Sequence, residues 1–250
     1  MSLTEKKVTS LSGYVEVVAA MVAQWSDTAQ GEVRPWYRGQ SRAEWGLIPG
    51  EYRVPDVNAD EIRSEFQLKA RPLLREAQQT EWEWYFLMQH HGLPTRLLDW
   101  TTGALLGLYF ALREGVGEYD AAIWILDPWA LNQAHLGKPE LLLCSEPKAQ
   151  AYLPRLFSRR PGLPEYPIAI VPPYNSDRIT VQRGTFTVHG SERRGLEDLF
   201  ESRFAKVVVP KGSALKIKRG LRGGGIGEFT VFPDLDGLCR EIRAVEIEGC

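Results

Sequence analysis

Three short segments contain the polar residues that are candidates for catalysis or ligand binding. The first is Trp36-Tyr37-Arg38-Gly39-Gln40, which ends a strand expected over residues 33–37. An arginine at a strand end can hold a phosphate through two parallel N–H donors, and a glycine behind it lets a ligand approach the backbone. A surface arginine in a plain turn fits the same residues, so this segment alone leaves both interpretations open.

The second segment covers residues 90–102, HHGLPTRLLDWTT, between two apolar helical patterns. Its candidate ligand-binding or catalytic groups are His91, Arg96, Asp99, Thr101 and Thr102. Such a density of polar groups in a connection expected to be buried must be satisfied by the protein or by a ligand. The alternative is structural: an Arg96–Asp99 ion pair that pins a loop over residues 93–100, with the threonines as helix caps.

The third segment is Gln182-Arg183-Gly184-Thr185-Phe186. A glycine beside Gln182 in a β segment suggests a bulge, or a place where another group approaches the backbone closely. A plain hairpin with an exposed Arg183 is the alternative.

Patterns for several other chemistries are missing from the sequence. It has no P-loop, nucleophile elbow or kinase motif. Residues 221–227, LRGGGIG, lack the Lys-Ser/Thr of a P-loop and are expected to form a flexible connection. Asp234 opens a segment like a calcium loop, but no glutamate closes it, so helix capping is expected instead. The three cysteines and four histidines show no metal-ligand spacing, and we expect no metal site.

The charge distribution limits the partners that the chain could have. Its formal net charge is −2, which gives no overall attraction to nucleic acid or to an anionic membrane. Between Ser202 and Gly227, however, basic residues from Arg203 to Arg222 occur without any acid. This basic segment fits a solvated surface or a nucleic-acid contact. Since no signal peptide and no apolar run of about 20 residues are visible, we expect a cytoplasmic protein without a membrane span.

Periodicity predicts helices in the first half of the chain and mainly strands after it. The expected helices cover residues 14–25, 60–76, 80–91, 102–113 and 235–243, and the expected strands cover 121–126, 168–171, 178–181, 184–188 and 205–209. A capping box formed by Thr80 and Glu83 marks one helix start, and Gly92 its end. This order favours a single α+β domain over residues 1–250, with N-terminal helices packed on a mostly antiparallel β core.

Taken together, the segments resemble the FRG family, whose name describes the motif matched here by Tyr37-Arg38-Gly39. The resemblance continues through HHGLPTRLLDWT, LYFAL, AAIWIL, QRGTF and FPDLDG, and covers roughly residues 33–240. It implies a fold relationship more than a particular reaction.

A more distant resemblance is to mono-ADP-ribosyltransferases, which carry an Arg-Gly, then a Ser/Thr strand leading into an apolar helix, then a Glu-x-Glu motif. It implies a split sheet with NAD bound as a substrate. The catalytic residues would be Arg38, Asp99 and Gln182. The residues expected to contact NAD are Arg38, Gly39, His91, Arg96, Thr101 and Thr102.

The chain departs from the transferase pattern in the third segment. Gly184 stands where the last glutamate of that motif would be, and Gln182 is neutral. A charge lost opposite a developing cationic sugar typically costs about 3 kcal/mol in the transition state. Either another acid substitutes, with Asp99 as the first choice, or the pocket binds NAD or a related nucleotide without turnover.

We therefore expect an ADP-ribosyltransferase-like protein that binds NAD and modifies a macromolecular target, as a toxin or phage-defence effector. A nucleotide-sensing module with the same pocket and a nucleic-acid-binding protein that uses the basic segment are the alternatives. For the first two functions, Arg38, Asp99, Thr101 and Gln182 must line one common cleft.

Overall fold

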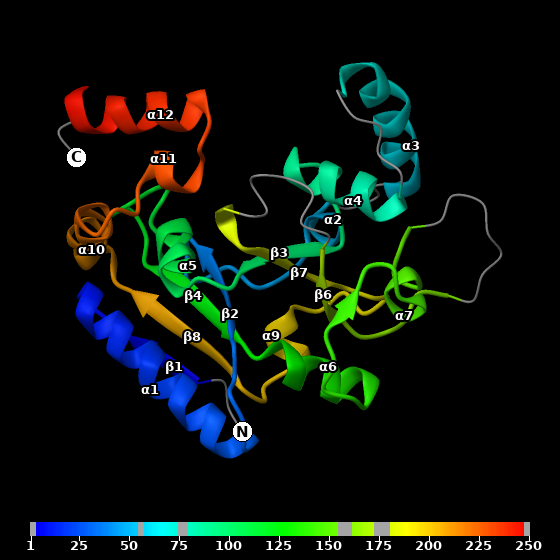
Figure 1. Ribbon diagram of the computed structural model, residues 1–250, viewed down its shortest axis with the longest axis horizontal. Helices are drawn as coiled ribbons and strands as arrows, with labels where there is room; N and C mark the ends of the chain where they lie inside the picture. The colour runs from blue at the N-terminus through cyan, green and yellow to red at the C-terminus, as the bar shows by residue number, and fades with distance from the viewer. Residues whose placement is uncertain (1–3, 55–57, 75–79, 155–161, 173–180, 248–250) are drawn as a thin grey trace.

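A computed structural model describes residues 4–54, 58–74, 80–154, 162–172 and 181–247 (Figure 1). These residues form one eight-stranded sheet with the strand order β1-β8-β4-β2-β3-β7-β6-β5. The strands are β1 (Thr4–Lys7), β2 (Trp36–Gln40), β3 (Leu97–Thr101), β4 (Ala121–Leu126), β5 (Leu142–Leu143), β6 (Ile168–Val171), β7 (Gly184–Val188) and β8 (Phe204–Val209). The β1–β8 and β5–β6 pairs are parallel and the others antiparallel. The α+β prediction is therefore confirmed, with a mixed, mostly antiparallel sheet.

The sheet is paired least at its centre. Strands β2 and β4 are in register from Trp36 to Gln40, and β3 and β7 from Leu97 to Thr101. Between β2 and β3 the register contains one residue pair, Tyr37 with Thr101. Two well-paired halves of the sheet thus meet at a single point.

Helices cover both faces of the sheet. The helices are α1 (Leu11–Ala29), α2 (Gly50–Arg53), α3 (Ala59–Ala70), α4 (Glu81–His90), α5 (Ala104–Ala111), α6 (Pro128–Leu136), α7 (Pro147–Gln150), α9 (Leu196–Leu199), α10 (Lys211–Gly223), α11 (Glu228–Val231) and α12 (Leu235–Ile242), with a 3-10 turn at Arg71–Leu73 and a π turn at Arg243–Ile247. Figure 1 shows α1 lying along β8 and α5 over β2 and β4. None of the described helices is long and apolar enough to cross a membrane.

The hydrophobic core divides where the sheet is weakly paired. On one face, α1, α5 and α10 pack around Tyr37, Ile123 and Val207, while α4 and α7 pack around a separate cluster that includes Leu97 and Phe186. On the opposite face a single cluster joins both halves through their tryptophans. Neighbouring strand residues fall in different clusters because their side chains alternate between faces. The first face is thus left with a gap between its two clusters.

Several local predictions are confirmed. The capping box at the start of α4 is present, because Glu83 N–H donates to the Thr80 hydroxyl and Thr80 N–H to the Glu83 carboxylate. Gly92, just beyond α4, has φ +76°, and Asp234 caps α12. The strands over residues 121–126, 168–171 and 184–188 have the expected bounds.

Other expectations were wrong. The loop expected over residues 93–100 contains most of β3, because Leu97–Thr101 pairs along its length with β7, far away in sequence. The glycine-containing run at 221–227 begins inside α10 rather than forming a free connection. The strand expected over residues 33–37 is β2, which covers residues 36–40 instead. The strand expected at 178–181 lies mostly outside the described residues, and Val181 is helical.

The packing of α5 against β2 requires a glycine at position 39. A Cβ atom at this position would overlap the carbonyl oxygen of Gly107 and the backbone nitrogen of Ala111, both in α5. Backbone atoms held by helical hydrogen bonds cannot move aside as a flexible side chain would. The backbone of α5 therefore lies directly against β2.

We predict that Gly39→Ala destabilises the fold by at least about 3 kcal/mol, the upper end for overpacking of a core. The matched control is Gly212→Ala in α10, where no atom lies within 4 Å of the added Cβ and a neutral or stabilising effect is expected. Urea unfolding of both variants measures the difference. A Gly39→Ala protein as stable as wild type would contradict the packing argument.

Candidate functional site

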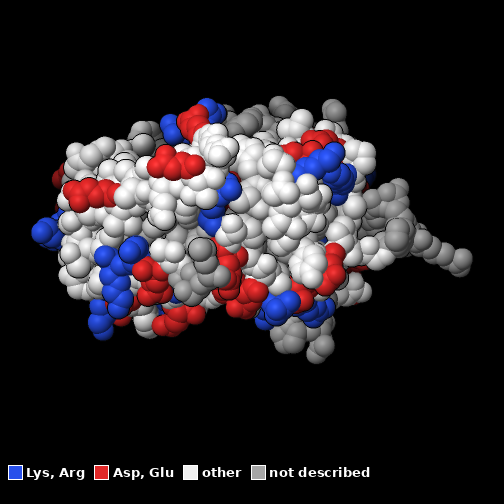
Figure 2. Space-filling view, turned by 90° about the horizontal axis from the view of Figure 1, so that it is seen from below, with Lys and Arg blue, Asp and Glu red and all other residues white. Residues whose placement is uncertain are grey.

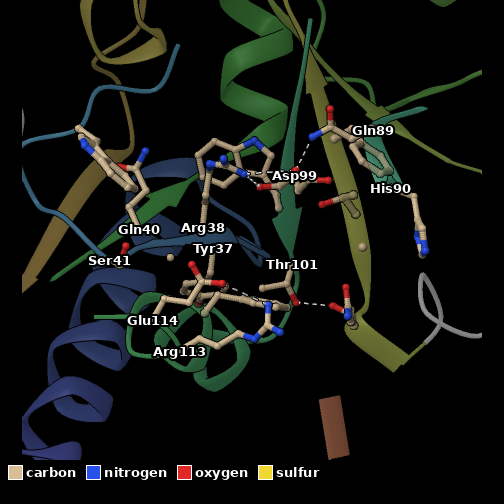
Figure 3. Close-up of a pocket in the computed structure, with 18 of the residues that line it drawn as sticks. Tyr37, Arg38, Gln40, Ser41, Gln89, His90, Asp99, Thr101, Arg113 and Glu114 are labelled. Carbon is tan, nitrogen blue, oxygen red and sulfur yellow. Dashed lines mark hydrogen bonds and ion pairs between the residues drawn. The ribbon is translucent and has the colours of Figure 1, made fainter. Parts of the chain in front are cut away.

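A pocket of about 390 Å³ lies where β2 and β3 diverge from their single residue pair. Its aromatic lining is Tyr37, Trp45, Phe86, Trp100, Phe110, Phe186 and Phe232. Its polar lining includes Arg38, Gln40, Ser41, Arg53, Gln89, His90, Asp99, Thr101, Arg113, Glu114 and Gln182 (Figure 3). Arg38, Asp99, Thr101 and Gln182, which come from three separate segments, thus line one common pocket.

The side chain of Arg38 is mostly buried. It is 19% exposed, and its Nη1 donates to the Asp99 carbonyl oxygen at 2.7 Å and lies 3.6 Å from the Asp99 carboxylate. Burial lowers the pKa of Arg38, and the Asp99 charge partly opposes this shift. The buried Nε has no hydrogen-bond partner among the described residues. A second anion in the pocket would therefore stabilise this guanidinium.

The Asp99 carboxylate is oriented by a short chain of hydrogen bonds. Gln89 Nε2 donates to Asp99 Oδ2 at 2.6 Å, as the dashed line in Figure 3 shows, and Gln89 Oε1 accepts from the Thr95 hydroxyl. The Asp99 side chain remains 54% exposed. It is therefore an accessible carboxylate held in one orientation.

Thr101 and Gln182 connect β3 to the residues just before β7. The Thr101 hydroxyl donates to the Gln182 backbone carbonyl at 2.7 Å and accepts from Gly103 N–H at 3.1 Å. Gln182 belongs to a helical turn rather than to a β segment, and Arg183 after it has φ +49°. The Gln182 amide donates to the carbonyl of Val231 at 3.3 Å. These contacts hold the pocket wall together.

Three of the residues expected to contact NAD do not line the pocket. His91 is exposed and caps the C-terminus of α4. Thr102 is also exposed, and its backbone N–H donates to the carbonyl of Arg183. Arg96 is buried and donates to the carbonyl oxygens of His189, at 2.8 Å, and Tyr152. The structure gives these three residues structural contacts instead.

The ion pair expected between Arg96 and Asp99 does not form. Arg96 Nε lies 3.6 Å from a Glu51 carboxylate oxygen, and Asp99 lies beside Arg38. Arg96 and Asp99 are three residues apart in extended chain, so their side chains point to opposite faces of the sheet. Arg96 thus has its contacts inside the fold, and Arg38 is the arginine that pairs with Asp99 in the pocket.

The sequence reasoning missed several residues of the pocket. Glu114 and Arg113 follow α5 directly and lie 3.7 Å apart, and Arg113 Nε also lies 3.2 Å from Glu228. A charged pair at the end of an otherwise apolar helix was the signal available in the sequence. Gln89, the second-last residue of α4, carried no such signal, because its partner Asp99 is brought close to it only by the fold.

The basic segment is dispersed over β8 and α10, where several of its residues have partners. Arg203 pairs with Asp127 at 2.8 Å, Lys206 lies 3.8 Å from Glu5, and Lys218 donates to a backbone carbonyl. On the face shown in Figure 2, Lys and Arg are interspersed with Asp and Glu. No group of three or more potential metal ligands occurs within the described parts of the chain.

Comparison with known proteins gives one match. Residues 34–119 match the FRG domain. No curated protein and no solved structure matches the chain. The matched residues include Arg38, Gln89, Asp99 and Thr101, while Gln182 lies outside them. The resemblance to FRG proteins is confirmed over this part of the sequence.

We predict that Arg96→Leu destabilises the protein by about 3 kcal/mol or more, because it leaves the Glu51 carboxylate, 17% exposed, without its cation. Asp99→Asn, at a half-exposed position, should change the free energy of unfolding by less than about 1 kcal/mol. Urea denaturation of both variants decides. Equal destabilisation would show that Asp99 has a structural role as large as that of Arg96.

His189, beside Arg96, predicts a pH dependence of stability. Its ring is fully buried, neither ring nitrogen has a partner among the described residues, and burial lowers its pKa to about 3. The unfolded chain, with a pKa near 6.5, binds the proton more readily. Stability contributed by neutral His189 is therefore complete above about pH 6.5 and is lost towards pH 3, by up to about 1.4 kcal/mol per pH unit. His189→Gln should show a shallower slope in urea titrations at several pH values, and an unchanged slope would contradict this assignment.

Proposed function

We propose that this protein, which carries an FRG domain over residues 34–119, binds NAD in the pocket between β2 and β3 and transfers ADP-ribose to a macromolecular target. One observation carries the proposal. Arg38, Asp99, Thr101 and Gln182 come from three segments that are far apart in sequence, yet they line the same pocket. The resemblance to ADP-ribosyltransferases required this arrangement.

The architecture around the pocket supports the same proposal. An ADP-ribosyltransferase-like split sheet needs two sheet halves that separate beside the nucleotide. Here β2 and β3 share one residue pair, and the core on one face divides into two clusters at the same place. The lining residues of the pocket come from both clusters, with Phe110 and Phe232 on one side and Phe86 and Phe186 on the other.

The lining of the pocket suits a nucleotide. Its volume of about 390 Å³ lies within the range of small-molecule sites, and its walls combine aromatic rings with a few polar groups. The rings of Phe86 and Phe186 are stacked with centroids 4.7 Å apart. Aromatic walls can contact a planar base, while the Arg38 guanidinium can contact a phosphate or ribose oxygen.

Transfer requires a negative charge near the reacting sugar. The bond between nicotinamide and the ribose C1′ breaks, nicotinamide leaves with the bonding electrons, and a nucleophile of the target then bonds to C1′ and loses its proton. A fixed carboxylate stabilises the cationic sugar in between. Asp99 and Glu114 are both in the pocket. Asp99 is held by Gln89, whereas the side chain of Glu114 is 78% exposed, so we assign this role to Asp99.

A second candidate is NAD binding without turnover. It is favoured by the third segment, where Gln182 presents an amide and Gly184 no side chain at the place of the transferase glutamate. An amide can donate a hydrogen bond to a ribose hydroxyl but cannot offset a positive charge. In that case the protein would sense NAD or a related nucleotide.

We predict that wild-type protein releases nicotinamide from NAD and that Asp99→Asn lowers the rate about a hundredfold, while its melting temperature remains close to that of wild type. Glu114→Gln is the matched control, since it neutralises the other carboxylate of the pocket and should change the rate less than threefold. Nicotinamide release and thermal melting, with and without NAD, are measured on the same samples.

The outcomes separate the candidates. A melting shift with NAD but no nicotinamide release supports the binding module. A loss of rate in Glu114→Gln instead of Asp99→Asn would move the acid to Glu114. Neither a melting shift nor release would contradict both functions.

A further inference from the structure

Arg53, the last residue of α2, brings a second guanidinium to the pocket. It lines the pocket together with Arg38, and its side chain is exposed. Its Nε donates to the carbonyl oxygen of Ile48 at 2.6 Å, and this hydrogen bond orients the guanidinium group. No described carboxylate forms an ion pair with its two terminal nitrogens, so these donors are available to a ligand.

The helix that carries Arg53 is fixed to the sheet. Glu51 N–H donates to the carbonyl of Thr95 at 3.0 Å, and the Glu51 carboxylate lies 3.6 Å from Arg96 Nε. The hydroxyl of Tyr85 donates to the same carboxylate at 3.4 Å. Arg96, although outside the pocket, thus anchors α2 beside the start of β3 and sets the position of Arg53.

Two arginines in one pocket repel each other unless an anion lies between them. Both arginines line the same pocket, and burial lowers the pKa of Arg38, with the positive charge of Arg53 lowering it further. Asp99 supplies one opposing charge, and it is half exposed and shared with Gln89. A ligand with two negative charges would relieve the repulsion and could use the donor forks of both arginines.

We propose that Arg53 and Arg38 together bind a diphosphate. In the proposed function this group is the diphosphate of NAD, so the identity of the whole ligand rests on that proposal. The pairing of Arg38 and Arg53 around one diphosphate, here called the clamp, does not depend on the proposed function, because inorganic pyrophosphate offers the same two charged groups. Arg53 is then a binding residue that positions the nucleotide, and it takes no part in the bond-breaking step.

The test measures binding by calorimetry with ADP-ribose, inorganic pyrophosphate and adenosine as probes. The variants are Arg53→Gln, which removes the charge, and Arg53→Lys, which keeps the charge and removes the fork. Arg219→Gln, at an exposed position of α10 outside the pocket, controls for the general loss of one positive charge. Equal melting temperatures establish that each variant is folded.

We expect Arg53→Gln to weaken ADP-ribose and pyrophosphate binding at least about tenfold, as for a lost hydrogen bond to a charged group. The affinity of Arg53→Lys for both probes should lie between those of wild type and Arg53→Gln. The affinity for adenosine should not change in any variant, and Arg219→Gln should bind all three probes as wild type does. Unchanged ADP-ribose and pyrophosphate affinity in Arg53→Gln would overturn the clamp, even if NAD binds. No pyrophosphate or ADP-ribose binding by wild type would overturn it as well. Pyrophosphate binding that depends on Arg53, without any binding of NAD or ADP-ribose, would support the clamp and reject the proposed function.

Discussion

The backbones of β2 and α5 lie in direct contact, and this contact shapes the pocket. At Gly39 there is no room for a side chain, and Gly107 on the helix faces Tyr37 in the same close way. Thr101, just before α5, and Glu114, just after it, line the same pocket as Arg38. The motif glycine therefore shapes the pocket through the helix that it admits, in addition to lying in the pocket wall itself.

Arg96 stabilises the fold, whereas Arg38 belongs to the candidate site. Arg96 is buried with Glu51 and two backbone carbonyls, so its charge is satisfied inside the protein. Arg38 is mostly buried, Asp99 is its one ion-pair partner among the described residues, and Asp99 lines the pocket. A buried charge that is fully compensated stabilises one conformation, whereas one that is partly compensated attracts a ligand. The first network also holds α2 in place, and so the structural arginine supports the site.

The candidate site was partly predictable. Polar residues in unexpected density between apolar helices pointed to Asp99 and Thr101, and an Arg-Gly at a strand end pointed to Arg38. Arg53 could not be found in this way, because an exposed arginine at the end of a short helix resembles any surface arginine. That His91, Arg96 and Thr102 do not line the pocket could not be predicted either, since it depends on which face of a strand or helix each residue occupies.

Several local features could be predicted from the sequence alone: the capping box at Thr80 and Glu83, the buried strand of residues 121–126, and the cap at Asp234. The hydrogen bonds of the two caps join residues three positions apart, and the strand is marked by a continuous apolar run between Asp120 and Asp127. Three features could not be predicted without the tertiary structure: that LLDWT is a strand, that Arg96 and Asp99 have different partners, and that residues from three separate segments line one pocket. Each of these depends on pairing with segments such as β7, whose position along β3 is fixed by the packing of the whole sheet.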